Sequence, residues 1–321
     1  MFIESLINIF QPLLLLIILL GVSLGIIWGA LPGLSTTMAM ALLIGFTSTM
    51  EQDIAICFML GVYTGSVFGG AISAILINIP GTPDAVPTMI EGHALAKKGE
   101  AGTALGTAIF GSFIGNWIGI LILIFLMPFL IAIALNFKSW EMFLLSIIGI
   151  SVCGTMCSGE LPIKGWIVGW IGILIAMVGI DPIYGIERFT FNNPNFYDGF
   201  NYIPILIGLF GICEIVKTLP NKNKSPIPEK VGKLFLPLKK LFGYVKTSIR
   251  SGLIGTFIGA LPGAGANVAS FLSYDIGKKR AKPEEKKLWG KGSYEAIVSA
   301  EVANNANIGG SILPTLALGI P

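Results

Sequence analysis

The 321-residue sequence contains few charged residues: Asp, Glu, Lys and Arg together make up 12% of it. An average soluble domain has about 25%. Hydrophobic residues make up 54% of the sequence, so a soluble fold would need a core far larger than a domain of this length can enclose. The composition excludes an ordinary soluble protein and predicts an all-α polytopic membrane protein.

Residues that commonly carry catalysis or bind metals are also scarce. The four cysteines all lie in apolar stretches, where Cys behaves as a small hydrophobic residue. The spacing of Cys153 and Cys157 is not that of a redox or zinc motif. His93 is the only histidine, and we expect it on the surface near a cytoplasmic loop rather than in a proton relay. The sequence has no Walker motif, metal-ligand cluster or nucleophile elbow, so we expect neither an enzyme nor a bound cofactor.

Basic residues are nearly absent outside two stretches. Sixteen of the 21 Lys and Arg residues lie in 217–250 and 278–291. Nucleic-acid binding could explain such clusters, but beside long apolar spans the positive-inside rule is the simpler cause. Both stretches are therefore predicted to be cytoplasmic. The turn at Glu51-Gln52-Asp53 has no basic residue and is predicted to be periplasmic.

Long apolar runs predict helices over 6–27, 34–50, 54–78 and 104–135. Gly and Pro interrupt them in a repeated pattern. Gly29-Ala30-Leu31-Pro32-Gly33 returns 230 residues later as Gly259-Ala260-Leu261-Pro262-Gly263. The stretch 63–70 that leads to Ile79-Pro80-Gly81 is loosely matched, 240 to 241 residues later, by 304–310 leading to Ile320-Pro321. Gly and Pro break helices, and in a membrane such breaks persist only where protein or a watery cavity satisfies the freed backbone groups. Paired breaks of this kind point to the binding site of a transporter.

The second copy begins with a short apolar piece. Only 27 residues, 251–277, separate the two basic cytoplasmic stretches, whereas two full crossings need about 40. We therefore predict a re-entrant hairpin with its tip at Leu261-Pro262-Gly263. The equivalent piece of the first copy ends at the acidic turn 51–53. Equivalent loops of opposite charge predict inverted-topology repeats, with re-entrant or broken helices at the GALPG and IPG motifs and a substrate site near the membrane midplane.

These boundaries divide the chain into three parts. Residues 1–220 are predicted to form the first transmembrane repeat, 221–250 a basic cytoplasmic linker, and 251–321 the start of a second repeat. Residues 233–242 mix apolar and basic side chains, as in a helix lying on anionic lipid or a solvated tether with a few buried anchors. Because the second copy stops at the position of Pro80, we expect it to be truncated and the complete protein to have about 460 to 500 residues.

A half-helix that starts after a break offers free N–H groups and a positive dipole end to an anion. Small hydroxyl and amide side chains add donors without bulk. We predict that the substrate is bound by Gly33, Ser35, Thr36, Thr37, Gly81, Thr82, Gly263, Gly265, Asn267, Asn304 and Asn305. The alternatives are that the hydroxyl groups cap helices and that the amides pair helices.

Polar groups inside apolar spans are also candidates for ion coupling. We select Asp84, Asn307 and Glu301, because carboxylate and amide oxygens can bind a cation or carry a proton. Asp84 could instead cap a helix. The expected coupling ion is Na⁺ or H⁺.

Four strings carry a resemblance to a known family: residues 29–34 (GALPGL), 79–85 (IPGTPDA), 91–99 (EGHALAKKG) and 259–266 (GALPGAGA). With these strings the whole chain resembles the large membrane subunit of the bacterial tripartite tricarboxylate transporters. The resemblance implies ion-gradient-driven import of citrate or related carboxylates across the bacterial inner membrane. It also implies two partners, a periplasmic solute-binding protein and a small membrane subunit. The alternatives are a transporter of the same architecture for another, possibly neutral, solute, and, more remotely, an intramembrane enzyme.

Overall fold

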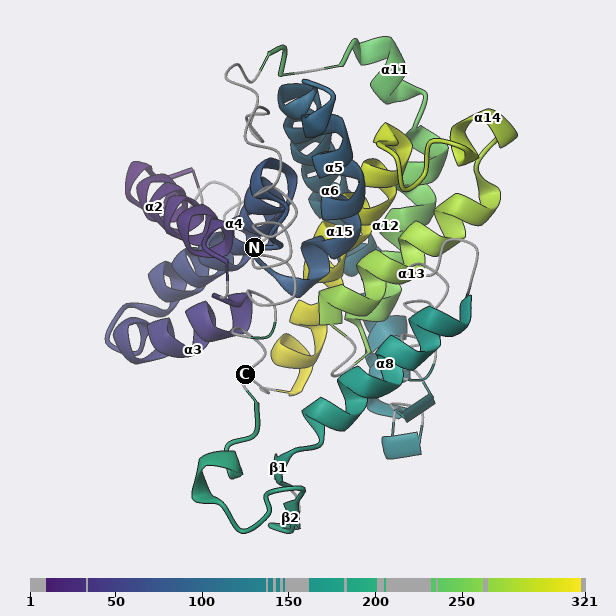
Figure 1. Cartoon of the computed structure of the whole chain (residues 1–321). Helices are drawn as coiled ribbons and strands as arrows, with labels where there is room; N and C mark the ends of the chain where they lie inside the picture. The colour runs from purple at the N-terminus through teal and green to yellow at the C-terminus, as the bar shows by residue number, and fades with distance from the viewer. Residues whose placement is uncertain are drawn as a thin grey trace.

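The computed structural model describes residues 10–32, 34–136, 138–140, 143–144, 147, 162–181, 184–200, 205, 232–234, 236–261 and 265–318. Three helices in these ranges are long and apolar enough to cross a membrane: α2 (Pro12–Ala30), α4 (Gln52–Ile77) and the Ala101–Phe125 part of α6 (Ala101–Asn136). Their presence agrees with the predicted membrane protein (Figure 1).

The remaining elements connect these helices or pack against them. They are α3 (Thr36–Thr47), the 3-10 turn η1 (Pro83–Ala85), α5 (Val86–Lys97), α8 (Pro162–Ala176), the paired strands β1 (Gly179–Ile180) and β2 (Glu187–Arg188), η2 (Pro194–Phe196), α11 (Leu238–Phe242), α12 (Val245–Gly259), α13 (Gly265–Arg280), α14 (Pro283–Lys286) and α15 (Tyr294–Leu318). The four helices predicted from apolar runs all occur. The first begins at Pro12, a residue favoured at the first position of a helix.

Helices α2 and α4 pack backbone against backbone through glycine. A Cβ atom at Gly29 would lie 2.0 Å from the carbonyl oxygen of Ser66, and one at Gly69 would lie 2.5 Å from that of Ile26. Small residues allow membrane helices to approach this closely. Any larger side chain at these two positions would push the helices apart.

Helices α12 and α15 repeat this contact in the same register. A Cβ atom at Gly259 would lie 2.3 Å from the carbonyl oxygen of Asn307, and one at Gly310 would lie 2.2 Å from that of Thr256. These residues follow their counterparts on α2 and α4 by 230 and 241 positions, which are the offsets of the sequence motifs. The repeated motifs therefore build two helix pairs with the same packing. Their opposite orientation in the membrane stays a prediction.

Helix α15 is the centre of the described structure. It packs against α6, α12, α13 and α5, and every residue from 296 to 310 is buried. Polar side chains in this stretch can therefore find hydrogen-bond partners only inside the protein.

The short helices α12 and α13 form a hairpin. With 15 and 16 residues they extend about 22 and 24 Å, less than the roughly 30 Å of a hydrocarbon core. Lys246 near the start of α12 and Arg280 at the end of α13 line one pocket, so the chain returns to the end from which it came. Of the predicted tip, Leu261 is described and buried, whereas Pro262 and Gly263 lie outside the described residues. The depth of the tip in the membrane stays a prediction.

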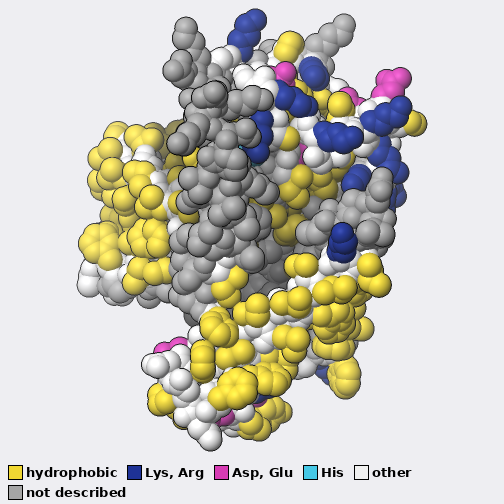
Figure 2. Space-filling model, in the orientation of Figure 1, with side chains coloured by type: hydrophobic (Ala, Val, Ile, Leu, Met, Phe, Trp, Pro, Cys, Tyr) yellow, Lys and Arg dark blue, Asp and Glu magenta, His cyan; other side chains and the backbone are white. Residues whose placement is uncertain are grey.

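Basic side chains gather at one end of the molecule, around α11 and α14, in Figure 2, while the β1–β2 hairpin lies at the other end in Figure 1. Lys98 Nζ donates a hydrogen bond to the carbonyl oxygen of Lys291 at 2.5 Å, so two loops predicted to be cytoplasmic meet. In the linker, Leu241 and Tyr244 are buried. This favours a tether with buried anchors, although the division of the chain at 220 and 250 stays a prediction.

Candidate functional site

The first GALPG motif and the IPG motif, at which helix breaks were predicted, meet at glycine. Helix α4 ends at Asn78, which adopts a left-handed conformation with φ 57°. The Gly81 N–H then donates to the carbonyl oxygen of Gly70 at 3.3 Å. A Cβ atom at Gly81 would lie 2.0 Å from the carbonyl oxygen of Gly29. The IPG motif is thus packed directly on the first GALPG motif, which fixes the start of η1.

The turn η1 carries two buried polar residues into the centre of the protein. Thr82 is 1% exposed and Asp84 is 5% exposed. The turn packs against α13 and α15, and the side chain of Asn304 on α15 neighbours the Asp84 carboxyl group, as Thr82 does. We call Thr82, Asp84 and Asn304 the η1 cluster. It joins predicted site residues from the two sequence copies.

Polar atoms of the η1 cluster are unsatisfied within the described part of the chain. Thr82 Oγ1, Asp84 Oδ2 and both polar atoms of Asn304 are buried and have no hydrogen bond of good geometry there. Asn304 therefore lies beside the carboxyl group without an aligned hydrogen bond to Oδ2. Buried polar groups are normally paired, and an unpaired one costs about 1–3 kcal/mol. Carboxylate, hydroxyl and amide oxygens together are the ligands that hard cations use.

Glu301 belongs to a different, satisfied network. Its fully buried carboxyl group accepts hydrogen bonds from Thr88 Oγ1 at 2.5 Å, Ser112 Oγ at 3.1 Å and Asn305 Nδ2 at 3.4 Å. These bonds join α15 to α5 and α6. For Glu301, an ion-coupling role stays a prediction, and its contacts are those of a residue that holds helices together.

The asparagine side chains near Glu301 differ in how far their polar atoms are hydrogen-bonded. Asn305 Nδ2 donates to Ser112 Oγ at 2.8 Å, and Asn305 Oδ1 accepts from Asn116 Nδ2 at 3.3 Å. Asn307 Nδ2 donates to the carbonyl oxygen of Gly255 at 3.4 Å, while its Oδ1 is unpaired within the described residues. Asn305 is thus engaged in helix pairing, whereas the side chain of Asn304 lies beside the Asp84 carboxyl group without a well-aligned hydrogen bond among the described residues.

The remaining predicted site residues lie at helix starts. Ser35 Oγ accepts a hydrogen bond from the backbone N–H of Met38 at 3.1 Å, which is the capping role considered above. Thr36 Oγ1 is buried and unpaired among the described residues. Helix α3 packs mainly against α4 and α2. The structure therefore does not bring α3 into the η1 cluster, and Gly33 and the side chain of Thr37 lie outside the description.

The second GALPG motif leads to the start of α13. Gly265 opens the helix with φ +70°, a left-handed conformation that suits glycine, and Asn267 is exposed in the first turn. Helix α13 packs on η1, so the helix that begins here does reach the η1 cluster.

The comparison with known proteins assigns the chain to a family. Residues 15–321 match the tripartite tricarboxylate transporter TctA family. This chain belongs to that family. An uncharacterised 52.8 kDa protein in the TAR-I ttuC′ 3′ region of Agrobacterium vitis is 37% identical over 304 residues, covering 94% of this chain and 60% of that protein. A protein in the TAR-II ttuC′ 3′ region of the same species is 44% identical over 68 residues, covering 21% of this chain and 27% of that protein.

The chain thus spans 60% of the length of the first of these relatives. No solved structure matches it. Membership of the TctA family, a family of membrane transporters, confirms the resemblance found in the sequence.

One expectation for this TctA family member was wrong. His93 is not on the surface: it is 5% exposed, and its Nδ1 lies 3.2 Å from the carbonyl oxygen of Ile75. Helix α5 packs against α4, α6 and α15, so His93 is enclosed even though the helix ends in an exposed turn at 97–100. The nearby lysines suggested a surface position, but they follow His93 by a full helical turn.

The sequence also gave no sign of the role of Glu91. Its fully buried carboxyl group accepts hydrogen bonds from Tyr274 Oη and Gly290 N at 2.5 Å, Gly292 N at 2.9 Å and Ser293 N at 2.8 Å. A buried charge requires such partners. Glu91 therefore fastens α5 to α13 and to the start of α15. The only signal was its place in the EGHALAKKG string.

Proposed function

We propose that this chain forms part of the membrane-embedded carrier of an ion-gradient-driven importer of tricarboxylates or related carboxylates. Its place in the TctA family and its three apolar helices support this proposal. The word tripartite in the family description supports two further components, for which we propose a periplasmic solute-binding protein and a small membrane subunit. The proposed location is the bacterial inner membrane, with several passes.

The observation that carries the proposal is the unsatisfied polarity of the η1 cluster. Thr82 and Asp84 come from the break after α4, and Asn304 comes from α15, so the cluster lies between the two sequence copies. Substrate and ion sites of inverted-repeat transporters lie at the repeat interface and are built from interrupted helices. The cluster has both properties if the two copies are inverted, as we propose.

The charge of the cluster argues for coupling to a cation. Asp84 is a carboxyl group, and the cluster contains no basic side chain to offset it. A carboxylate substrate brought near an ionised Asp84 would be repelled by about 4 kcal/mol at 4 Å for an effective dielectric constant of 20. A Na⁺ ion or a proton at Asp84 removes this repulsion. Substrate and cation would then bind together, which is the requirement for symport.

Helix α13 supplies the complementary part of the proposed site. Its N-terminal turn, with Gly265 and the exposed Asn267, can direct N–H groups and an amide toward a substrate carboxylate. Because α13 packs on η1, anion and cation would be bound on adjoining elements.

Uptake by the complete transporter, reconstituted in vesicles with its partners, tests the proposal. Labelled citrate is the probe, with an imposed Na⁺ or proton gradient. We expect gradient-dependent uptake that falls at least tenfold in Asp84→Asn, while Asp198→Asn, an exposed residue, remains unchanged. Uptake without any gradient, or full activity of Asp84→Asn, would overturn the coupling mechanism.

The second candidate is a transporter of the same architecture for a neutral solute. The lack of a basic side chain in the η1 cluster favours it, because a neutral molecule needs no counter-charge. Citrate that neither enters nor competes, together with uptake of a neutral compound by the same vesicles, would support this alternative.

A further inference from the structure

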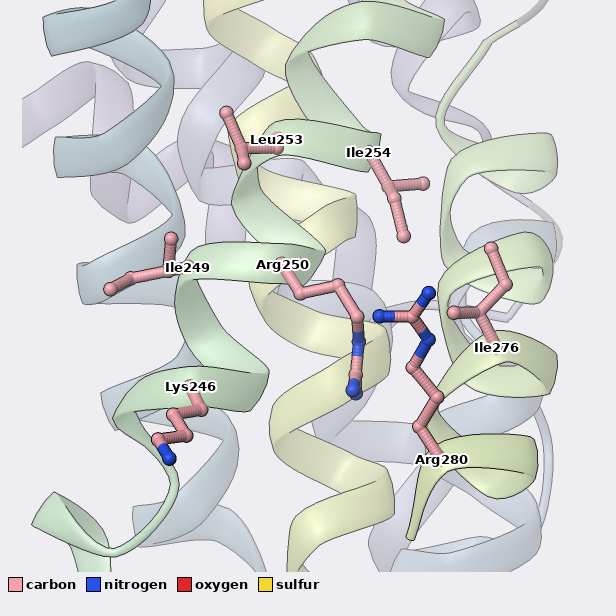
Figure 3. A pocket seen from close by; sticks show the side chains of 7 residues that line it. All are labelled: Lys246, Ile249, Arg250, Leu253, Ile254, Ile276 and Arg280. Atoms are coloured by element: carbon pink, nitrogen blue, oxygen red, sulfur yellow. The ribbon is translucent and has the colours of Figure 1, made fainter.

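A second polar feature lies far from the η1 cluster, in the groove between α12 and α13. A pocket of about 540 Å³ there is lined by three basic side chains, Lys246, Arg250 and Arg280. Figure 3 shows the guanidinium groups of Arg250, from α12, and Arg280, from α13, directed into the same space. Two cations that face each other in this way repel one another unless an anion lies between them.

The protein provides no such anion among the described residues. Arg250 Nε and Nη2 are buried and have no hydrogen bond there. Glu295 attracts the Arg250 guanidinium electrostatically, but its carboxyl group accepts a hydrogen bond from Thr247 at 2.6 Å and forms no close ion pair with Arg250. On α13, Asp275 is paired with Lys279 at 2.6 Å. Neither carboxyl group is therefore paired directly with Arg250 or Arg280, and the positive charge of the pocket is at most partly offset.

The walls of the pocket are aliphatic. Ile249 and Leu253 on α12 are 52% and 54% exposed, and Ile254 and Ile276 complete the lining. Lys246 lies near the start of α12 and Arg280 at the end of α13, on the side of the molecule where the basic side chains gather. Leu253 lies farther along α12, away from that end. A small soluble anion gains little from such walls. A molecule with a negative head and a hydrocarbon tail matches both parts.

We propose that this groove binds an anionic phospholipid of the cytoplasmic leaflet. Its phosphate is held by Arg250 and Arg280, with Lys246 beside them, and an acyl chain lies along Ile249 and Leu253. Basic pockets between helices on the cytoplasmic side bind such head groups. Guanidinium groups pair with phosphate through two parallel hydrogen bonds. The lipid joins α12 to α13 at the open end of their hairpin, so it also supports the helix that reaches the η1 cluster.

Lipid retention by the full-length protein, purified in a neutral detergent, tests the site. Native mass spectrometry would compare added phosphatidylglycerol with phosphatidylcholine. We expect one tightly retained phosphatidylglycerol and at least about tenfold weaker binding in the double variant Arg250→Gln/Arg280→Gln. Lys287→Gln removes one positive charge at an exposed position outside the pocket and should retain the lipid as the wild type does.

Three results would overturn the proposal. They are undiminished phosphatidylglycerol binding by the double variant, equal retention of phosphatidylcholine, and displacement of the lipid by millimolar inorganic phosphate or citrate, which would indicate a site for soluble anions. If the double variant does not fold, Arg280→Gln alone decides the question. Arg280 is exposed at the end of α13, and its loss should weaken retention several-fold without unfolding the protein.

Discussion

Asn304 on α15 lies beside the carboxyl group of Asp84 on η1, although the two residues are 220 positions apart in the sequence. Asn305, the next residue, is directed to α6, where it bonds with Ser112 and Asn116. Asn304 thus faces polar atoms without aligned hydrogen bonds, whereas its neighbour Asn305 links two helices. This difference makes the functional reading of the η1 cluster testable by mutation.

Alanine substitution of Asn304 should reduce transport, whereas alanine substitution of Asn305 should reduce stability. Asn304→Ala removes an amide that is unpaired within the described residues, so the thermal unfolding temperature should hardly change while citrate uptake falls. Asn305→Ala removes one hydrogen-bond partner each from Ser112, Asn116 and the Glu301 carboxyl group and should cost about 1–3 kcal/mol of stability. Thermal unfolding in detergent and vesicle uptake measure the two effects. Normal transport by Asn304→Ala would contradict a ligand role for this residue.

The glycine contacts predict a second pair of effects. In Gly29→Ala the new Cβ would meet the Ser66 carbonyl oxygen, and in Gly259→Ala it would meet that of Asn307. Both variants should lose about 1–3 kcal/mol or more, because backbone atoms cannot give way as a flexible side chain can. The yield of folded protein and its unfolding temperature are the measurements.

Gly172→Ala is the control for these variants. Gly172 lies in α8 with no atom within 4 Å of an added Cβ, so alanine there should be neutral or stabilise the helix by up to about 1 kcal/mol. Equal tolerance of alanine at all three positions would show that the close packing of the two helix pairs is wrong.

Glu91 should be essential for holding α5 in place. Glu91→Gln removes the charge and replaces an acceptor oxygen by a donor NH₂ group, which cannot accept from the N–H groups of Gly292 and Ser293. Hydrogen bonds to a charged group contribute about 1.5–3 kcal/mol each, so we expect a marked fall in the unfolding temperature. Glu284→Gln, in an exposed turn, should have no such effect. Similar unfolding temperatures for both variants would contradict the role of Glu91 as a fastening point.

The sequence predicted those parts of the fold that depend on local pattern. The apolar runs anticipated the helices, and the GALPG repeat and its offsets anticipated that the chain contains two related copies. The equivalent packing of α2 on α4 and of α12 on α15 was not predicted and comes from the structure. The sequence did not reveal which face of a helix meets which neighbour, or which distant loops come into contact. Neighbouring amides at 304 and 305 look alike in a sequence, and only the packing of α15 between η1 and α6 separates them.

The burial of individual polar residues could not be predicted from the sequence either. His93 and Glu91 lie close to lysines, which suggested an exposed segment, but α5 is enclosed by four other helices. The partners of Glu91 are backbone N–H groups some 200 residues later. No local pattern marks such a contact. The Arg250–Arg280 pocket was hidden for the same reason, since each arginine had been counted only as part of a basic stretch.

The inverted orientation of the two repeats can be decided by labelling. Gln52 and Lys282 are both exposed, and they follow equivalent helices, α3 and α13, in the two copies. In a variant without native cysteines, Gln52→Cys should react with a membrane-impermeant maleimide added outside, and Lys282→Cys only after the membrane is opened. The charge asymmetry is the physical reason, because basic loops stay in the cytoplasm whereas the turn at 51–53 has no basic residue. Reaction of both cysteines from the same side would show that the repeats are parallel, and the proposed site between inverted copies would then lose its structural basis.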